Sequence, residues 1–389
     1  MLSDVKILDL STLLPGPYAS MMLADLGAKV LRVESAARVD LVREMSPQVG
    51  ISSAAHQYLN RSKESIALDL KQPEAIEIIK TLVEEYDVVL EQFRPGVMDR
   101  LGIGYEALKA VNPKIIYCAI TGYGQTGPYK DRAGHDLNYL AIAGISSYSK
   151  RKKQSPIPQG IQIADVAGGS LHGVIGILTA LHHRQRKGEG QMIDISMTDC
   201  AFALNAMSGA GALAGDEIPT AESQLLNGGS FYDYYQTSDG RYLSVGSLEP
   251  KFFTGLCQLL GLDHLLPLAN KISAQQQIKD SFTQAFSQKT YDEWQSVFIE
   301  LDLCVEPVLN LKEASEHPQI VAREMIVDVP HPNTGMQKQL ACPIKFSTYQ
   351  VEYQQTGGEI GADGKQVLSE MGLSDSRIKS LEKNGIVTL

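Results

Sequence analysis

The chain has 389 residues, of which 43% are hydrophobic and 21% charged, proportions typical of a globular protein with a sizeable core. Its 45 acidic and 35 basic side chains give a formal net charge of -10, which repels phosphate backbones, so we expect no nucleic-acid partner. The five cysteines include no Cys-x-x-Cys pair, and their number is odd. This pattern predicts neither a disulfide framework nor a zinc site.

The first residues lead directly into an apolar run, without the basic segment and cleavage site of a signal peptide. The longest nearly apolar stretch, around 174–181, is too short to cross a bilayer. We therefore expect a cytoplasmic protein without a membrane partner.

Short β-branched runs alternate with helical patterns over the first two hundred residues. Strands are predicted at 5–10, 28–34, 65–70, 87–90, 114–120 and 191–195, and helices at 17–26, 73–84 and 168–183. Strands separated by helices predict an α/β domain with a doubly wound, mostly parallel, Rossmann-like sheet.

The character of the sequence changes after about residue 222. Strands predicted at 231–235 and 242–245 flank Ser238-Asp239-Gly240, a turn typical of a hairpin, and helices are predicted near 250–260, 275–287 and 290–300. We therefore divide the chain into a large α/β domain, 1–222, and a smaller α+β domain, 225–330. The helical tail, about 365–386, has too little apolar content to form a core of its own, so the C-terminal segment from about 335 to 389 is expected to pack back on the large domain.

Gly122-Tyr123-Gly124-Gln125-Thr126-Gly127 follows a predicted strand and has the G-x-G-x-x-G spacing of a dinucleotide fingerprint. That fingerprint requires a helix to begin at the glycines, so that its N-terminus holds a pyrophosphate. Here Pro128 and further helix-breaking residues follow instead. A structural glycine loop is the better interpretation.

His135 lies beside Gly134, just before the next helical pattern. A histidine flanked by glycine on a loop is free to meet a ligand, and it titrates near neutral pH. Asp136 is suited to capping the helix that follows. For His135 the residues alone leave a functional and a structural interpretation open.

Asp165 precedes Gly168 and Gly169 at the start of the long predicted helix. Its plain interpretation is a helix cap. Glycines at a helix start also let a ligand approach backbone N–H groups, where negative charge is favoured. Asp165 is therefore a candidate acid, base or nucleophile. Glu249 lies where the hairpin gives way to a helix, and its plain interpretation is a favourable charge in the first helical turn.

Several separate stretches resemble family III CoA-transferases. They are Leu8-Asp9-Leu10, Leu14 to Ala19, Leu23 to Val30, Leu68 to Lys71, Phe93 to Val97, Leu101-Gly102 and Thr121 to Gly124. The match runs in order from the N-terminus to about residue 205. One departure lies in the tail, where 360–364 replaces a Gly-Glu-His-like segment of the relatives.

Within this family the segment Gly134 to Tyr139 is similar to the α-methylacyl-CoA racemase branch. The resemblance implies that His135 and Asp165 exchange the α-proton of an acyl-CoA, with Glu249 paired to the histidine. A racemase needs two bases on opposite faces of Cα, which these residues would supply. The N–H groups after Asp165 are expected to hold the enolate oxygen.

The resemblance also implies contacts with the coenzyme A moiety of the substrate. The expected contact residues are Arg38, Leu68, Leu70, Lys71, Phe93, Arg94, Arg100, Gly134, Asp136, Asn138 and Tyr139. No metal, flavin, nicotinamide or other prosthetic group is implied. Family members form interlocked homodimers, so a second copy of the chain is the expected protein partner.

We therefore predict an enzyme that interconverts epimers of 2-methyl-branched or similarly α-substituted acyl-CoA thioesters, as in fatty acid metabolism. The rival enzyme is a CoA-transferase that forms an acyl anhydride on Asp165. The two alternatives share fold, ligand and aspartate, and only His135 with its context separates them. A third alternative is a catalytically inactive CoA-binding or assembly protein, which any turnover would eliminate.

Overall fold

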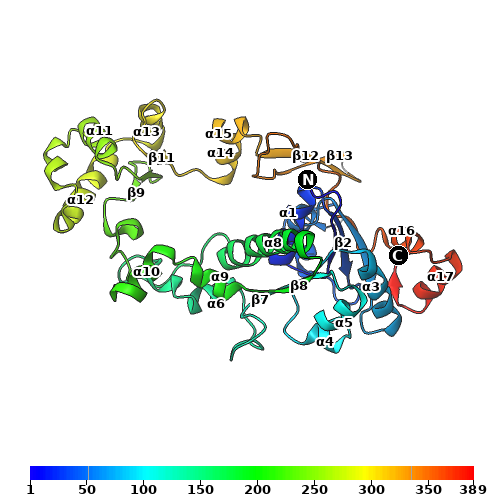
Figure 1. Ribbon diagram of the computed structural model, residues 1–389. Coiled ribbons are helices and arrows are strands. Elements are labelled where there is room, and N and C mark those ends of the chain that lie inside the picture. Colours follow the sequence, from blue (N-terminus) through cyan, green and yellow to red (C-terminus); the bar gives the residue numbers. More distant parts are fainter. Residues whose placement is uncertain (51, 334) are drawn as a thin grey trace. The chain divides into compact units, whose positions relative to one another are not determined.

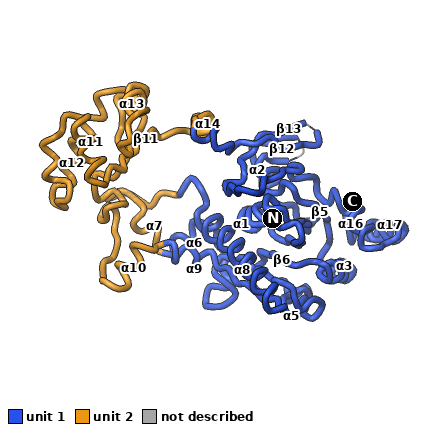
Figure 2. Tube along the Cα trace, turned by 45° about the horizontal axis from the view of Figure 1, so that its top comes forward, with its two compact units in different colours: residues 1–143, 159–204, 319–389 blue, residues 144–158, 205–318 orange. Residues whose placement is uncertain are grey.

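The computed structural model describes residues 1–50, 52–333 and 335–389, which form two compact units (Figure 2). The first unit contains 1–143, 159–204 and 319–389, and the second contains 144–158 and 205–318. The sequence predicts a small domain at 225–330, whereas the second unit begins earlier, ends earlier and takes in the separate stretch 144–158.

A seven-stranded sheet is the centre of the first unit (Figure 1). Its strands are β1 (Lys6–Asp9), β2 (Lys29–Glu34), β5 (Lys63–Leu68), β6 (Val88–Glu91), β7 (Ile116–Thr121), β8 (Gln191–Ser196) and β14 (Val387–Thr388). Their order is β14-β5-β2-β1-β6-β7-β8, and every neighbouring pair is parallel except β14 with β5. The six parallel strands thus follow the Rossmann order 3-2-1-4-5-6, which confirms the predicted mostly parallel sheet.

Helices cover both faces of this sheet. On one face, α3 (Pro73–Glu85), α5 (Tyr105–Val111), α16 (Gly364–Glu370) and α17 (Asp375–Lys383) share a hydrophobic cluster with the strands. On the other face, α1 (Pro15–Asp25) packs on β1 and β6, and α8 (His172–Lys187) packs on β7 and β8. α16, α17 and β14, which lie in the segment expected to pack back on this unit, contribute to its core and to its sheet.

The two faces differ in chemistry because neighbouring side chains of a strand point to opposite sides. Leu8, Leu31 and Ile66 belong to the apolar cluster under α3. Arg32 and Lys63 point to the opposite face, where both are buried and carry ion pairs. That face therefore combines close packing with a buried polar network.

The remaining elements of the first unit are short. They are η1 (Leu41–Glu44), β3 (Gln48–Val49), β4 (Ser52–Ser53), α2 (Ala54–Leu59), α4 (Val97–Arg100), α6 (Asp136–Ile142), α9 (Met197–Ala203), and the hairpin β12 (Ile326–His331) with β13 (Gly335–Leu340). The helix α15 (Pro318–Ala322) spans the boundary between the units.

The long helix predicted at 168–183 is two elements in one run. It begins as a π-helix, η2 (Ala164–Leu171), and continues as α8. The run Ala164–Lys187 has a hydropathy of 1.4 over its most apolar window, so by length and composition it is long enough to cross a membrane. The expectation from the sequence that no stretch is long enough is therefore wrong. Half of that window is buried in the protein, and the helix packs on the sheet, which accounts for its apolar composition.

The second unit contains a three-stranded antiparallel sheet, β9 (Asp233–Gln236), β10 (Tyr242–Val245) and β11 (Val305–Pro307). β9 and β10 form the predicted hairpin, whose turn contains Gly240 at φ +84°. The helical elements are α7 (Ile145–Tyr148), α10 (Ala206–Gly215), η3 (Leu225–Gly229), α11 (Pro250–Leu260), η4 (Asp263–Leu268), η5 (Ile272–Ala274), α12 (Gln275–Phe286), α13 (Tyr291–Phe298) and α14 (Leu311–Glu316). Its core is rich in aromatic rings, including Phe253, Phe282 and Trp294.

Candidate active site

The topology of the sheet indicates where a ligand binds in the first unit. Strand order reverses between β1 and β6, and open α/β sheets bind ligands beyond the carboxyl ends of the strands at such a point. A hydrogen bond connects the segment after β1 with the segment after β6: Gln92 Oε1 accepts from Gly16 N–H at 2.9 Å. Phe93 and Arg94, two predicted CoA contacts, lie in the segment after β6.

His135 is held at the start of α6 by its neighbours in the chain. Its N–H donates to Asn138 Oδ1 at 3.0 Å, and its carbonyl accepts from Asn138 N–H at 2.8 Å. The preceding carbonyl, that of Gly134, accepts from the Tyr139 hydroxyl at 2.5 Å. The backbone on both sides of His135 is therefore fixed, while the residue itself is exposed.

The Tyr139 ring leaves no room for a side chain at two glycines, Gly122 in the glycine loop and Gly134 before His135. A Cβ at Gly122 would lie 2.6 Å from Tyr139 Cε1, and one at Gly134 would lie 2.7 Å from the same atom. Gly124 adopts φ +81°, which favours glycine. The next helix begins only at Asp136, so the interpretation as a structural loop is confirmed.

Asp165 is the second residue of η2, close to the helix start as predicted. Burial first, and the neighbouring Asp136 carboxylate second, raise the pKa of Asp165 from 3.8 to about 7. Near neutral pH this side chain is therefore present in both protonation states.

Asp136 connects the two candidate bases. Its Oδ1 accepts hydrogen bonds from Ala164 N–H at 2.6 Å and from Asp165 N–H at 3.1 Å. Since Asp136 directly follows His135, the backbone of the histidine lies close to that of Asp165. The structure thus brings together two residues that stand thirty positions apart in the sequence.

One expectation about the start of η2 is wrong. Gly168 and Gly169 do not open the backbone to a ligand, because both are buried: a Cβ at Gly169 would lie 3.1 Å from Met197 Cγ. Of the N–H groups after Asp165, that of Val166 donates to Gln162 O at 2.9 Å, and the expected contact of this stretch with an enolate oxygen stays a prediction.

Most predicted CoA contacts lie beyond the carboxyl ends of β2, β5 and β6. Arg38, Lys71, Arg94 and Arg100 are exposed, Leu70 and Phe93 are half-buried, and Leu68 is 2% exposed within the core cluster. Arg94 and Asp165 both act electrostatically on Tyr139, whose pKa is raised chiefly by burial. The charge of Arg94 is therefore close enough to act on Tyr139, which belongs to the same segment as His135. The CoA-binding roles of the whole set stay predictions.

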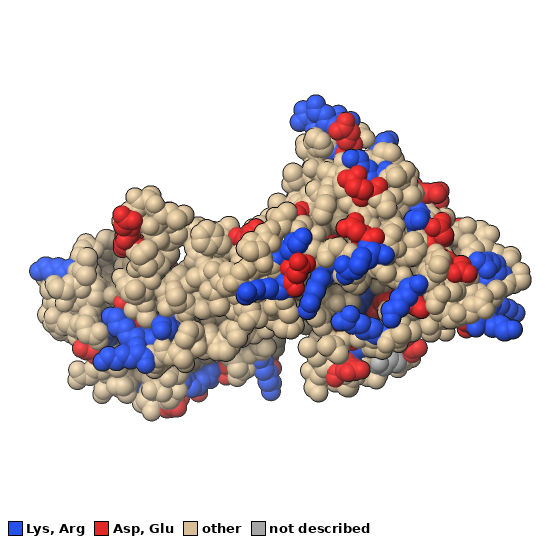
Figure 3. Space-filling view, turned by 90° about the horizontal axis from the view of Figure 1, so that it is seen from below, with Lys and Arg blue, Asp and Glu red and all other residues tan. Residues whose placement is uncertain are grey.

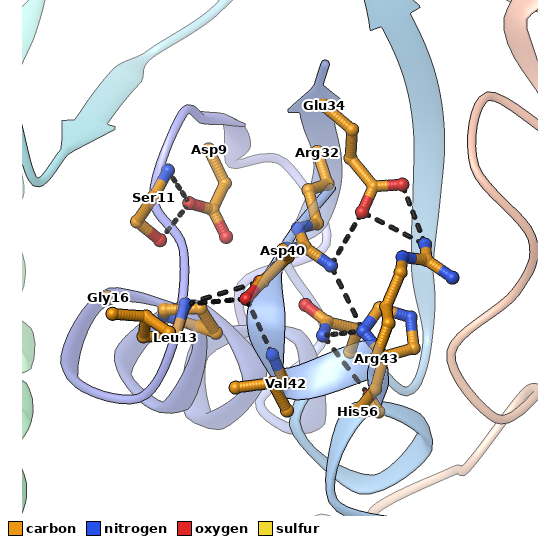
Figure 4. Close-up of polar contacts among 12 residues, drawn as sticks. Asp9, Ser11, Leu13, Gly16, Arg32, Glu34, Asp40, Val42, Arg43 and His56 are labelled. Carbon is orange, nitrogen blue, oxygen red and sulfur yellow. Dashed lines mark hydrogen bonds and ion pairs between the residues drawn. The ribbon is translucent and has the colours of Figure 1, made fainter. Parts of the chain in front are cut away.

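The structure contains a buried network of charged side chains that was not predicted from the sequence (Figure 4). Arg32 Nη1 lies 2.8 Å from Glu34, Arg43 Nη2 lies 2.7 Å from the same carboxylate, and Arg32 also pairs with Asp40. Two charged residues among the apolar residues of the strand predicted at 28–34 were the available signal. The network holds both ends of the segment that carries Arg38.

Asp40 also links the segments that follow β1 and β2. Its carboxylate accepts from the N–H of Leu13 at 3.2 Å and of Val42 at 3.1 Å (Figure 4). A second buried carboxyl, Glu91, ends β6 and accepts from Phe93 N–H at 2.7 Å, and burial raises its pKa to about 7. Both carboxyls shape the edge at which the predicted CoA contacts lie.

Glu249 lies in the second unit, exposed, at the N-cap of α11. Its predicted pairing with His135 stays a prediction. Within the described ranges no group of three or more His, Cys, Asp or Glu side chains is arranged to hold a metal ion. Basic and acidic side chains are interspersed on the surface drawn in Figure 3.

A model of CoA-transferase family III matches residues 2–364. The chain belongs to this family. One family III relative is the α-methylacyl-CoA racemase of Homo sapiens, 34% identical over 99% of this chain and 97% of its own. The succinyl-CoA:glutarate CoA-transferase of Homo sapiens is 30% identical over 99% of this chain and 90% of its own. A solved CAIB/BAIF family protein from Brucella suis superposes with a TM-score of 0.83 at 30% identity, covering 94% of this chain and 98% of that one.

Proposed function

We propose that this family III enzyme is a racemase that interconverts epimers of 2-methyl-branched or similarly α-substituted acyl-CoA thioesters. The observation that carries the proposal is the Asp136 bridge, which joins the segment of His135 to the backbone of Asp165. A racemase requires two bases held on opposite faces of one carbon. The 34% identity to a racemase over nearly the whole chain adds support.

In the proposed reaction, one base removes the α-proton and the electron pair of the C–H bond becomes the enolate. The conjugate acid of the other base then donates its proton to the opposite face. Atoms and charges balance, because one base gains the proton removed from Cα and the other loses the proton it donates. Proton exchange with solvent then restores the starting protonation of both bases. Histidine is suited to one role since its ordinary pKa lies near 6.5.

Asp165 is suited to the other role. An ordinary aspartate is almost entirely ionised at neutral pH and would rarely carry a proton to return. The raised pKa of Asp165, about 7, makes both its acid and its base form available there. Asp165 can therefore serve whichever epimer is bound.

The rival function, CoA transfer, is favoured by the relative that carries that name at 30% identity. In that reaction ionised Asp165 attacks the thioester and forms an anhydride, so partial protonation of Asp165 lowers the nucleophile concentration. The transferase route also leaves His135 without a role. These two points favour the racemase.

We further propose that the protein works as a homodimer in the cytoplasm and uses no prosthetic group. Large apolar side chains are exposed in each unit, which is typical of surfaces that another chain covers. In the first unit Ile142, Ile175 and Phe202 are 55%, 60% and 55% exposed. In the second unit, α10 has no buried residue, and its Met207 and Leu213 are 77% and 78% exposed.

The direct test supplies one epimer of a 2-methylacyl-CoA and follows the epimer ratio by chiral chromatography, with and without an added carboxylic acid. We expect the ratio to approach equilibrium without the acid, because inversion needs no second substrate. Turnover that occurs only with the acid, and transfers CoA to it, would establish the transferase instead.

A further inference from the structure

The carboxylate of Asp136 lies at a structural junction. Asp136 Oδ1 accepts from the N–H groups of Ala164 and Asp165, which stand 28 and 29 residues further along the chain. The residues immediately before η2, from Gln159 to Gln162, are exposed. The hydrogen bonds to Asp136 of α6 therefore hold the backbone of the first turn of η2 in place.

The hydrogen bonds of a helix start explain why an acceptor is needed there. The first N–H groups of a helix have no partner within it, and a π-helix is a rare form that occurs mostly at functional sites. Val166 N–H reaches back to Gln162, whereas those of Ala164 and Asp165 are taken by Asp136. Asp136 thus determines where Asp165 stands.

The same contact places a negative charge beside the Asp165 side chain. Apart from burial, Asp136 is the group that raises the pKa of Asp165. Six elements pack on η2, namely α1, α6, α8, α9, β7 and β8. Besides Asp136, they carry these titratable side chains: Tyr18, Asp25, Tyr117, Cys118, Tyr139, His172, His182, His183, Arg184, Arg186, Lys187, Asp194, Asp199 and Cys200. Tyr139 is the one whose own pKa registers the charge of Asp165.

We infer that Asp136 is a positioning residue, which fixes the backbone of Asp165 and sets the charge around its carboxyl group. This inference deepens the proposed racemase function, because it explains how an aspartate acquires an acid form at neutral pH. It also assigns the Asp136 carboxylate an intramolecular role, distinct from contact with CoA.

The test compares Asp136→Asn and Asp136→Ala. The asparagine amide oxygen can still accept both N–H bonds, so this variant removes the charge and keeps the anchor. Alanine removes both. Asp194→Asn is the matched control, because the Asp194 carboxylate also accepts a backbone N–H, that of Gln125 at 3.0 Å, and is not among the causes of the Asp165 shift.

The readout is the titration of Asp165 in full-length protein without substrate, by NMR of ¹³Cγ-labelled aspartate. The Asp165 signal is the one that Asp165→Asn removes. We expect a midpoint near 7 in the wild type. In Asp136→Asn we expect it to fall by about one pH unit, the usual size of the effect of one nearby charge, and in Asp194→Asn to stay in place.

Hydrogen exchange tests the anchor separately. Protection of the Ala164 and Asp165 amides should fall in Asp136→Ala and persist in Asp136→Asn. An unchanged Asp165 midpoint in folded Asp136→Asn would overturn the electrostatic role, and unchanged protection in Asp136→Ala would overturn the anchor. Neither measurement uses turnover, so failure of this inference and failure of the racemase proposal are distinguishable.

Discussion

The backbones of His135 and Asp165, the two proposed bases, are held by neighbouring side chains. Asn138 and Tyr139 fix the backbone around the histidine, and Asp136 fixes that of Asp165. The side chains of Asp136, Asn138 and Tyr139 each have a partner at hydrogen-bond distance, which accounts in physical terms for these polar residues of the run 134–139. The two proposed bases stand on neighbouring segments because Asp136, which directly follows His135, accepts a hydrogen bond from the N–H of Asp165.

The raised pKa of Asp165 makes a prediction about stability. Between pH 3.8 and about 7 the folded protein keeps a proton on Asp165 that the unfolded chain has lost. The free energy of unfolding therefore falls as the pH rises through this window. Asp165→Asn should remove this loss and raise the melting temperature at pH 8 more than at pH 4, as measured by calorimetry. An equal shift at both pH values would contradict the raised pKa.

His135 and Glu249 should behave as one unit if the glutamate orients the imidazole. His135→Ala and Glu249→Ala should each reduce kcat for inversion by about 10²-fold or more, the scale of a positioned acid–base group. The double variant should be scarcely slower than the slower single variant, because residues that act together are not additive. Losses that multiply in the double variant would exclude the pairing.

At the level of helices and strands, much of the first unit could be predicted because its apolar runs and helical periods are local patterns. β1, β2 and α3 lie within one or two residues of their predicted bounds. The position of Asp165 at a helix start could also be predicted. The π-helix could not, because its register depends on Asp136, 28 and 29 positions before the two residues whose N–H groups it accepts, and on packing against Met197.

The buried glycines and ion pairs escaped prediction for a related reason. In the sequence alone, Gly168 and Gly169 suggest a place where a ligand could approach the backbone. In the structure α1 and α9 pack against η2 and fill that space. Arg32 and Glu34 alternate with apolar residues along β2, and Arg43, which pairs with Glu34, comes from another element. Contacts between segments distant in sequence decide these features.

Arg61 joins elements from the two ends of the chain. Its side chain is fully buried, pairs with Asp25 at 2.6 Å and donates to the carbonyl of Leu340 at the end of β13. The rings of Tyr58 and Tyr353 lie 5.0 and 4.6 Å from its guanidinium carbon. This arrangement secures the β12–β13 hairpin to α1.

Arg61→Ala should lower the free energy of unfolding by about 3–5 kcal/mol, because it leaves Asp25 charged, buried and unpaired. Urea denaturation measures the loss. Lys80→Ala is the control, since its pair with Glu77 is exposed and should contribute less than about 1 kcal/mol. Similar losses in both variants would show that Arg61 does not hold the hairpin in place.

For the chain as a whole, the exposed apolar residues of both units predict a dimer. Light scattering on purified protein should give twice the chain mass of 42.4 kDa at micromolar concentration. Met207→Asp and Leu213→Asp, on α10, should shift the mass toward that of one chain, because a buried carboxylate is costly at an interface. Lys312→Asp, on α14, is the control at an exposed polar site. A fully active monomer would contradict the proposal.

In the proposed reaction Asp165 and His135 transfer protons, and Asp165 does not carry an acyl group. This reaction is tested by supplying one epimer of a 2-methylacyl-CoA in deuterated water, without an acceptor acid, and following deuterium at Cα by mass spectrometry. We expect deuterium in both epimers, because the returning proton comes from groups that exchange with solvent. Asp165→Asn should abolish inversion, while His135 continues to exchange the proton of one epimer. Absence of deuterium, together with inactivation by hydroxylamine that requires the acyl-CoA, would show an acyl–Asp165 intermediate and contradict the proposed racemase function.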